Sequence, residues 1–174
     1  MRIDDWEMIK LIWEDFGRSE YSQYNAPHPK SDDEIQKLVK FFAESGDFWL
    51  VFLLDTDTVV GTIDFHDTGK GYDLGYCFLS EYQKKGYAKE SCCALMDFYI
   101  KNGCKRFTAG TALKNTPSVK LLLSLGFHQI GTEQVSFYKD DQGIDVYFDG
   151  GIFELTKLKI IGTGKFFQKS IGTP

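Results

Sequence analysis

Apolar residues recur every three or four positions in four segments of the chain, which is the spacing of one face of an α-helix. These segments are residues 4–17, 31–45, 86–101 and 116–125. Ser31 and Glu34 form the pattern of a capping box at the start of the second segment. Pro117 suits the first turn of the fourth segment, and Gly126 stands directly after it, where glycine commonly ends a helix. We therefore predict four helices.

Six other segments are rich in β-branched and aromatic residues and predict strands. They are residues 48–54, 59–65, 72–79, 106–111, 127–138 and 144–157. Polar turns at 55–57 and 140–143 make hairpins of the first two and the last two strands. The elements then follow the order ααβββαβαββ. Because helices interrupt the strands, we predict an α/β (α+β) fold: a mixed, mostly antiparallel sheet flanked by helices, with one parallel pair across 72–111.

Length and composition fit one domain with a buried core, since the chain has 174 residues of which 43% are hydrophobic. The net charge of −5 is concentrated at the N-terminus, where residues 1–34 hold nine acids and four bases. Residues 35–174 carry 16 of each and balance. A net acidic chain is a poor candidate for nucleic-acid binding, which needs a basic surface. Solvated helix faces are the simplest interpretation of the N-terminal acids.

Cysteine and histidine spacing argues against disulfides and metal sites. The four cysteines form no C-x-x-C pair, and the three histidines stand apart from one another and from the cysteines. We expect reduced, mostly buried cysteines and no metal. The chain also lacks an apolar run of the ~18 residues that a membrane span needs, and its start lacks the apolar core of a signal peptide. These features predict a cytoplasmic protein without membrane association.

Residues 73–89 contain the chain's most informative segment, a predicted strand, a short turn and a helix start. Free backbone N–H groups at a helix start, together with the helix dipole, attract anions. Lys84, Lys85 and Lys89 add positive charge at this point. The segment therefore predicts a site for a ligand that carries phosphate.

The turn resembles the signature Q/R-x-x-G-x-G/A of the GNAT superfamily of acetyl-CoA-dependent N-acetyltransferases. Gln83, Gly86 and Ala88 supply its three defined positions. A second segment, from Asn115 to the Leu-Gly-Phe sequence at 125–127, is similar to the N-x-x-S/A…L-G-F segment of the same family. The two matches stand in the expected order with a predicted strand between them. Among GNAT proteins, the chain most resembles the ribosomal-protein N-terminal (RimJ/RimL-like) acetyltransferases and related small-amine acetylases.

The resemblance implies one GNAT domain over residues 1–174. Residues 1–46 would form the acceptor-side helices, 47–157 the core sheet and CoA site, and 158–174 a basic tail. Family members usually begin with a strand, whereas the first predicted helix here starts within a few residues of Met1. Either that strand is missing, or another segment such as the tail takes its place. An exposed sheet edge could then pair with a second subunit in a homodimer.

The resemblance also implies the residues that bind acetyl-CoA. The signature turn, which opens on Gln83, would cradle the pyrophosphate, the end of the preceding strand would pair with pantetheine through its backbone, and Asn115 would hydrogen-bond the pantetheine arm. The cradle residues are Lys84, Lys85, Gly86, Tyr87 and Ala88, with Lys89 just beyond, and the strand residues are Cys77, Phe78 and Leu79. One strand N–H would polarise the thioester carbonyl. Asn115 also suits a helix cap, and it can fill both roles.

Acetyl transfer to an amine needs a base for the ammonium proton and a partner for the departing thiolate. Asp73 is the first candidate base, acting through water, and Asp64 is the second. Many family members place a tyrosine acid where this chain has Leu122, so no tyrosine acid acts from that position. Ser118 carries over from the second segment, where its hydroxyl would hydrogen-bond the thiolate. Tyr138 is a more distant candidate.

The predicted function is N-acetyl transfer from acetyl-CoA to a primary amine, either a protein N-terminus or a small cationic amine. The N-terminal acids would lie on the acceptor side of a GNAT fold, where they could attract a cation. A catalytically silent CoA-binding or regulatory module is the alternative from another class. A generic α/β domain that binds a different phosphorylated ligand is the third hypothesis.

Overall fold

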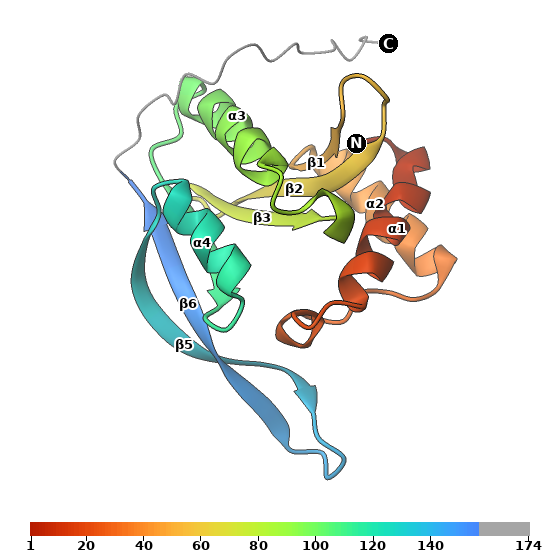
Figure 1. Cartoon of the computed structure of the whole chain (residues 1–174), viewed down its shortest axis with the longest axis vertical. Coiled ribbons are helices and arrows are strands. Elements are labelled where there is room, and N and C mark those ends of the chain that lie inside the picture. The colour runs from red at the N-terminus through yellow and green to blue at the C-terminus, as the bar shows by residue number, and fades with distance from the viewer. Residues whose placement is uncertain (157–174) are drawn as a thin grey trace.

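A computed structural model describes residues 1–156 of the chain, which form a six-stranded sheet with helices on both faces (Figure 1). The helices are α1 (Trp6–Gly17), α2 (Asp32–Ser45), α3 (Tyr87–Lys101) and α4 (Thr116–Ser124), with short 3-10 turns η1 (Ile3–Asp5), η2 (Ser22–Tyr24) and η3 (Ser80–Tyr82). The strands are β1 (Phe48–Phe52), β2 (Val59–Asp67), β3 (Tyr72–Phe78), β4 (Phe107–Ala112), β5 (His128–Lys139) and β6 (Asp145–Leu155). The predicted order ααβββαβαββ is confirmed.

The strands lie in the order β1-β2-β3-β4-β6-β5, and among these described strands only β3 and β4 run parallel. Both predicted hairpins, β1–β2 and β5–β6, are antiparallel as expected. Within residues 1–156 the two edges of this sheet are β1 and β5. Use of an edge by a second subunit stays a prediction. The proposed tail of residues 158–174, and its role in replacing an N-terminal strand, lie outside the described residues.

The main core lies between the sheet and the layer formed by α3 and α4. Its largest fully buried side chains come from three strands and two helices: Phe65, Phe107, Phe153, Ile63, Met96 and Leu122. A smaller core on the opposite face joins α1 and α2 to the sheet through Ile9, Ile35 and Val39. Burial of each such side chain contributes about 1.5–3 kcal/mol to folding. The two layers therefore hold the central strands from both sides.

The four cysteines are free thiols, and Cys92 and Cys93 are buried in the main core, as predicted. Cys77 and Cys104 are partly buried. Among residues 1–156, no helix has both the length and the apolar character needed to cross a membrane.

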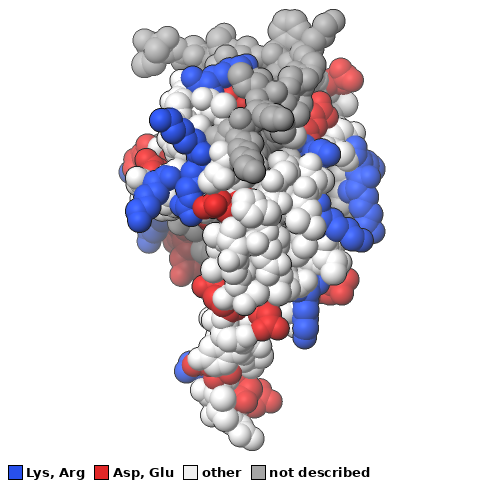
Figure 2. Space-filling model, turned by 90° about the vertical axis from the view of Figure 1, so that its left-hand side faces the viewer, with Lys and Arg blue, Asp and Glu red and all other residues white. Residues whose placement is uncertain are grey.

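The β5–β6 hairpin is long and projects beyond the body of the molecule (Figure 1). The turn η2 braces it, since the Tyr138 hydroxyl donates to the Ser22 carbonyl at 3.2 Å and the rings of Tyr24 and Phe148 meet edge to face at 5.3 Å. Figure 2 views this side of the molecule and shows a mostly uncharged middle with basic side chains on both flanks. Tyr138 of β5 thus lies against η2, and its hydroxyl is hydrogen-bonded to the Ser22 carbonyl.

Candidate active site

The strands β3 and β4 separate shortly after they meet, and this separation shapes the site. They pair only at Tyr72 with Phe107 and at Asp73 with Thr108. Beyond these two positions β3 continues along β2, while β4 continues along β6 to Ala112. The centre of the sheet therefore opens toward the carboxyl ends of two parallel strands, a position where α/β sheets commonly bind ligands.

Backbone donors of β3 line this opening. The Tyr72 N–H donates to the Arg106 carbonyl, just before β4, at 3.1 Å, whereas the Leu79 N–H donates to Val60 on β2 at 3.0 Å. Successive residues of a strand direct their amides to alternate sides. The N–H groups of Tyr76 and Phe78 consequently face the β4 side, past the point where the pairing ends. Of the three residues predicted to bind pantetheine by backbone, only Phe78 presents its amide to the opening.

A cavity of about 420 Å³ occupies this region and reaches to α1 and the loop after it. Its walls bring together residues that the sequence places far apart. They are Trp13, Phe16, Tyr21, Tyr24, Asn25, His28, Phe48, Thr62, Asp64, Leu74, Gly75, Tyr76, Cys77, residues 109–112, Asn115 and Ser118. Cys77, Asn115, Ser118 and Asp64 were predicted from the sequence. The aromatic residues of the α1 side were not, because no motif marks them.

Asp64 lies in the cavity wall on β2, directly opposite Gly75 of β3. A Cβ atom at Gly75 would stand 2.5 Å from each carboxylate oxygen of Asp64, so the glycine makes room for this side chain. Burial, followed by the charge of Asp73, raises the pKa of Asp64 to about 6. The carboxylate is thus partly protonated near neutral pH, which suits a group that takes up a proton during a reaction.

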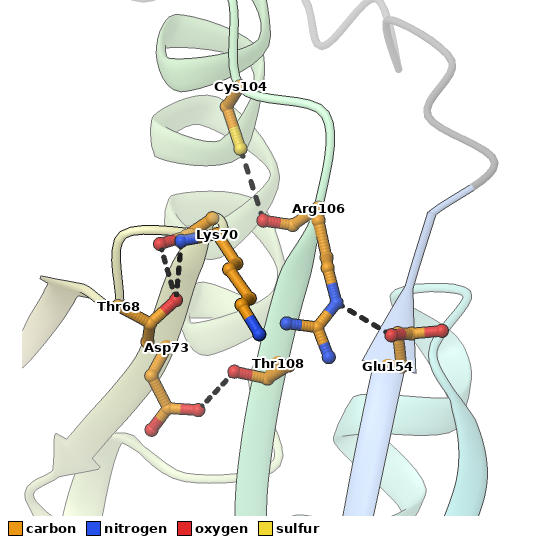
Figure 3. A network of polar contacts seen from close by, with 8 residues as sticks. Thr68, Lys70, Asp73, Cys104, Arg106, Thr108 and Glu154 are labelled. Carbon is orange, nitrogen blue, oxygen red and sulfur yellow. Dashed lines mark hydrogen bonds and ion pairs between the residues drawn. The ribbon is translucent and has the colours of Figure 1, made fainter.

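Asp73 does not belong to the cavity wall. Its carboxylate accepts a hydrogen bond from the Thr108 hydroxyl at 2.5 Å, across the last paired position of β3 and β4 (Figure 3). Close to it, Arg106 contacts Glu154 of β6 at 2.7 Å in the same polar network. These contacts hold the closed end of the β3–β4 opening together. Of the two candidate bases predicted from the sequence, Asp64 lines the cavity and Asp73 does not.

The hydroxyls of Tyr76 and Ser118 lie 2.8 Å apart, and both residues line the cavity. Burial raises the pKa of Tyr76, so its phenol keeps its proton at neutral pH. Leu122, which stands where many family members carry a tyrosine, is fully buried in the main core. Sequence reasoning missed Tyr76 because its partner is 42 residues away and its strand position by itself indicates packing.

Cys77 and Asn115, two predicted cofactor-binding residues, also line the cavity. Burial raises the pKa of Cys77 to about 12, so this thiol stays neutral and is a poor nucleophile. The Asn115 side-chain oxygen accepts the Ser118 N–H at 3.3 Å and caps α4, while Asn115 also lines the cavity. The two roles expected for Asn115 are thus compatible in space. In the part of the chain that is described, no cluster of three or more metal-ligating side chains occurs.

The turn before α3 has the shape of an anion cradle. Lys84 and Gly86 adopt positive φ values of 59° and 91°, and α3 begins at Tyr87. Among described residues, no side chain caps the first amides of α3, and a Cβ atom at Gly86 would meet nothing within 4 Å. Open space above uncapped amides at a helix start fits a pyrophosphate group. The predicted cradle residues therefore fit the phosphate part of CoA.

Gln83 has a structural role in this turn. Its side-chain amide donates to the Phe78 carbonyl at 2.8 Å and ties the turn to the end of β3. On the other side, the Asp15 carboxylate of α1 accepts both the N–H and the hydroxyl of Ser80, at 2.7 and 2.9 Å. These bonds fix the cradle relative to the β3 edge and to α1.

None of the nine acids in residues 1–34 lines the cavity. Asp5 is buried against Arg2, Asp15 holds Ser80, and Asp32 binds Lys10 at 2.6 Å. The other six acids, which are not buried, are Asp4, Glu7, Glu14, Glu20, Asp33 and Glu34. The interpretation as solvated helix faces and local pairs accounts for this charge, and the cavity wall gives no support to the predicted attraction of a cation by these residues.

Residues 1–128 match the family model of the acetyltransferase (GNAT) domain, and the chain belongs to this family. A relative from Bacillus licheniformis, described as uncharacterized N-acetyltransferase p20, is 30% identical over 178 residues, a match that covers 93% of this chain and 93% of the relative. The protein is therefore a GNAT N-acetyltransferase, and acetyl-CoA is its acetyl donor.

Solved structures share the fold at low sequence identity. An acetyltransferase from Salmonella typhimurium, which modifies the N-terminal serine of ribosomal protein L7/L12, superposes with a TM-score of 0.74 at 19% identity. The match covers 89% of this chain and 91% of that structure. Spermidine N-acetyltransferase from Vibrio cholerae, solved with CoA and spermine, gives a TM-score of 0.71 at 18% identity, covering 89% and 91%.

Proposed function

We propose that the protein transfers the acetyl group of acetyl-CoA to a primary amine that enters the cavity from the α1 side. The observation that carries this proposal is the position of Asp64. Its carboxylate stands in the cavity wall, with a pKa of about 6, beside a β3 edge whose amides have lost their β4 partners. A base and an oxyanion-binding edge in one cavity are what aminolysis of a thioester requires.

Acetyl-CoA would lie across the two features already described. The pyrophosphate fits the amides of Gly86, Tyr87 and Ala88 at the start of α3, with Lys84 and Lys85 nearby. The pantetheine arm fits the opening between β3 and β4. Asn115 stands at its α4 side. The thioester carbonyl oxygen would then accept a hydrogen bond from an amide of β3. The candidate donors are Tyr76 and Phe78, because their amides face the opening.

Two protons leave the acceptor nitrogen in this reaction. Asp64 takes the first from the ammonium, directly or through one water, so that the neutral amine attacks the thioester carbon. The N–C bond forms, the C–S bond breaks, and the electron pair leaves on sulfur, while the second proton passes from the nitrogen to water. The Tyr76–Ser118 pair donates a hydrogen bond to this thiolate. Because burial raises the pKa of Tyr76, its phenol stabilises the thiolate by hydrogen bonding instead of full proton transfer.

The acceptor presents a primary amine. The two solved structures compared above are named for acceptors of two kinds, a protein N-terminal serine and spermidine. Both kinds carry a primary amine to the thioester, and both were predicted from the sequence. The catalytic roles of Asp64, Tyr76 and Ser118 are part of this proposal, because membership of the family does not assign them. A homodimer is proposed on the same terms.

The test incubates the purified protein with acetyl-CoA and a panel of amines and follows thiol release. Turnover that needs both an amine and Asp64 supports the proposal. Tight CoA binding without turnover of any amine would instead favour a silent CoA-binding module. Lack of CoA binding in calorimetry would contradict both.

A further inference from the structure

The acceptor side of the cavity is mostly aromatic, with Asn25 of the α1–α2 loop as a polar neighbour of the rings. Six ring side chains line it, and they come from α1, from the loop between α1 and α2, and from the start of β1. They are Trp13, Phe16, Tyr21, Tyr24, His28 and Phe48. Among the described residues the wall contains a single carboxylate, Asp64, which the proposed function assigns to the reacting amine. A second cationic group on the acceptor would therefore meet rings instead of an acid.

The rings are held in place by one another. His28 packs edge to face on Trp13 at 4.6 Å and stacks on Phe16 at 5.8 Å. Burial lowers the pKa of His28, so the imidazole is neutral and adds no charge to the wall. Tyr24 rests on Phe148 of the projecting hairpin at 5.3 Å. A wall fixed in this way binds a complementary group with little loss of conformational entropy.

We infer that the acceptor is a primary amine whose neighbouring substituent is uncharged and apolar or aromatic. The inference rests on the proposed function and narrows its acceptor. An apolar substituent gains about 25 cal/mol for each Å² of surface that it buries against these rings. An ammonium group in the same place loses its hydration without gaining a carboxylate partner. A free arylalkylamine and the N-terminus of a peptide that begins with an apolar residue share this chemistry.

The test compares acceptors that have the same size and differ only in charge. Hexylamine and pentane-1,5-diamine have equal numbers of heavy atoms, so they differ by a methyl against an ammonium. We expect kcat/KM to be at least about tenfold higher for hexylamine, and higher again for phenethylamine. Tetrapeptides that begin with Phe or Lys, and spermidine, extend the comparison and separate peptide from small-molecule acceptors.

A variant pair ties the preference to the wall. Tyr24→Leu removes a lining ring, whereas Tyr147→Leu removes an exposed ring of the hairpin that does not line the cavity. We expect Tyr24→Leu to lower the ratio of kcat/KM for phenethylamine over hexylamine several-fold, with CoA affinity unchanged and Tyr147→Leu neutral. An unchanged ratio in Tyr24→Leu would count against the inference.

Two further outcomes would overturn the inference. Equal or better use of pentane-1,5-diamine or spermidine would mean that the rings form a cage for cations, and the proposed function would stand without this narrowing. Tight CoA binding with no amine acetylated at all would contradict the proposed function and this inference together.

Discussion

Gly75 lies directly opposite Asp64 in the β2–β3 ladder, and a Cβ atom there would stand 2.5 Å from both carboxylate oxygens of Asp64. Because Gly75 of β3 has no side chain, the carboxylate of Asp64, the candidate base on β2, has room at this position. This relationship keeps the carboxylate in the cavity wall, where burial and the charge of Asp73 raise its pKa to about 6.

Asp64→Asn should lower kcat/KM about a hundredfold, because an amide cannot take the ammonium proton. In the unmodified enzyme the base form is the carboxylate, so kcat/KM should rise as pH passes upward through about 6 and then level off. Initial rates of thiol release from pH 5 to 8 measure both effects. Asp73→Asn is the matched control, and a larger loss in that variant would return the base role to Asp73.

Asp64→Asn should also stabilise the folded protein at neutral pH. The folded-state pKa of Asp64, about 6, lies above the ordinary value of 3.8, so the folded protein binds more protons between these values and its free energy of unfolding falls as pH rises through them. Asp64→Asn removes this effect and should raise the free energy of unfolding by about 3 kcal/mol above pH 7. The gain should vanish below pH 4. Urea titrations at the two pH values measure it, and an equal gain at both would refute the electrostatic cause.

Gly75→Ala should reduce activity while the protein stays folded, because the new methyl group displaces the Asp64 carboxylate. We expect kcat/KM to fall about tenfold or more and CoA affinity to stay near normal. Gly17→Ala is the control, since a Cβ atom at Gly17 meets no described atom within 4 Å. Once Asp64 is already Asn, Gly75→Ala should cost little additional activity. Fully additive losses would show that Gly75 acts through another group.

Tyr76→Phe should lower kcat about tenfold by removing the hydroxyl that faces Ser118 at 2.8 Å. Ser118→Ala should cause a similar loss. Because the two hydroxyls act as a pair, the double variant should lose little more than either single variant. CoA affinity from calorimetry should be almost unchanged throughout. Unchanged kcat in Tyr76→Phe would remove this pair from the mechanism.

Gly86→Glu should abolish CoA binding, because a carboxylate would then occupy the open space over the α3 amides and repel the pyrophosphate. Gly143→Glu is a close control. Gly143 has a positive φ of 80°, similar to the 91° of Gly86, and a Cβ atom there would likewise meet no atom of residues 1–156 within 4 Å. It lies in the β5–β6 turn, away from the cradle. The two variants carry similar backbone strain, so calorimetry with CoA isolates the effect of the cradle. Normal CoA affinity in Gly86→Glu would move the phosphate site elsewhere.

The sequence by itself determined the order and kind of the elements, and it predicted the residues proposed to bind CoA. Helical and alternating apolar spacing are local properties, so the boundaries of α3 and the two hairpins follow from neighbouring residues. The same holds for the cradle at Gly86, since a helix start and its glycine turn lie within a few positions of the chain. The pattern at 83–88 and the segment at 115–127 were sufficient to indicate the family.

Only the tertiary structure decided which other residues line the cavity. We propose Asp64 before Asp73 as the base because the strand register sets Asp64 opposite Gly75 and Asp73 beside Thr108. Tyr76 meets a hydroxyl partner on α4, Ser118, that no local pattern connects to it. The N-terminal acids point to solvent or local partners, while the aromatic residues of the same segment line the cavity. Which face of a helix or strand meets a cavity depends on packing between distant segments, and that information is not local to the sequence.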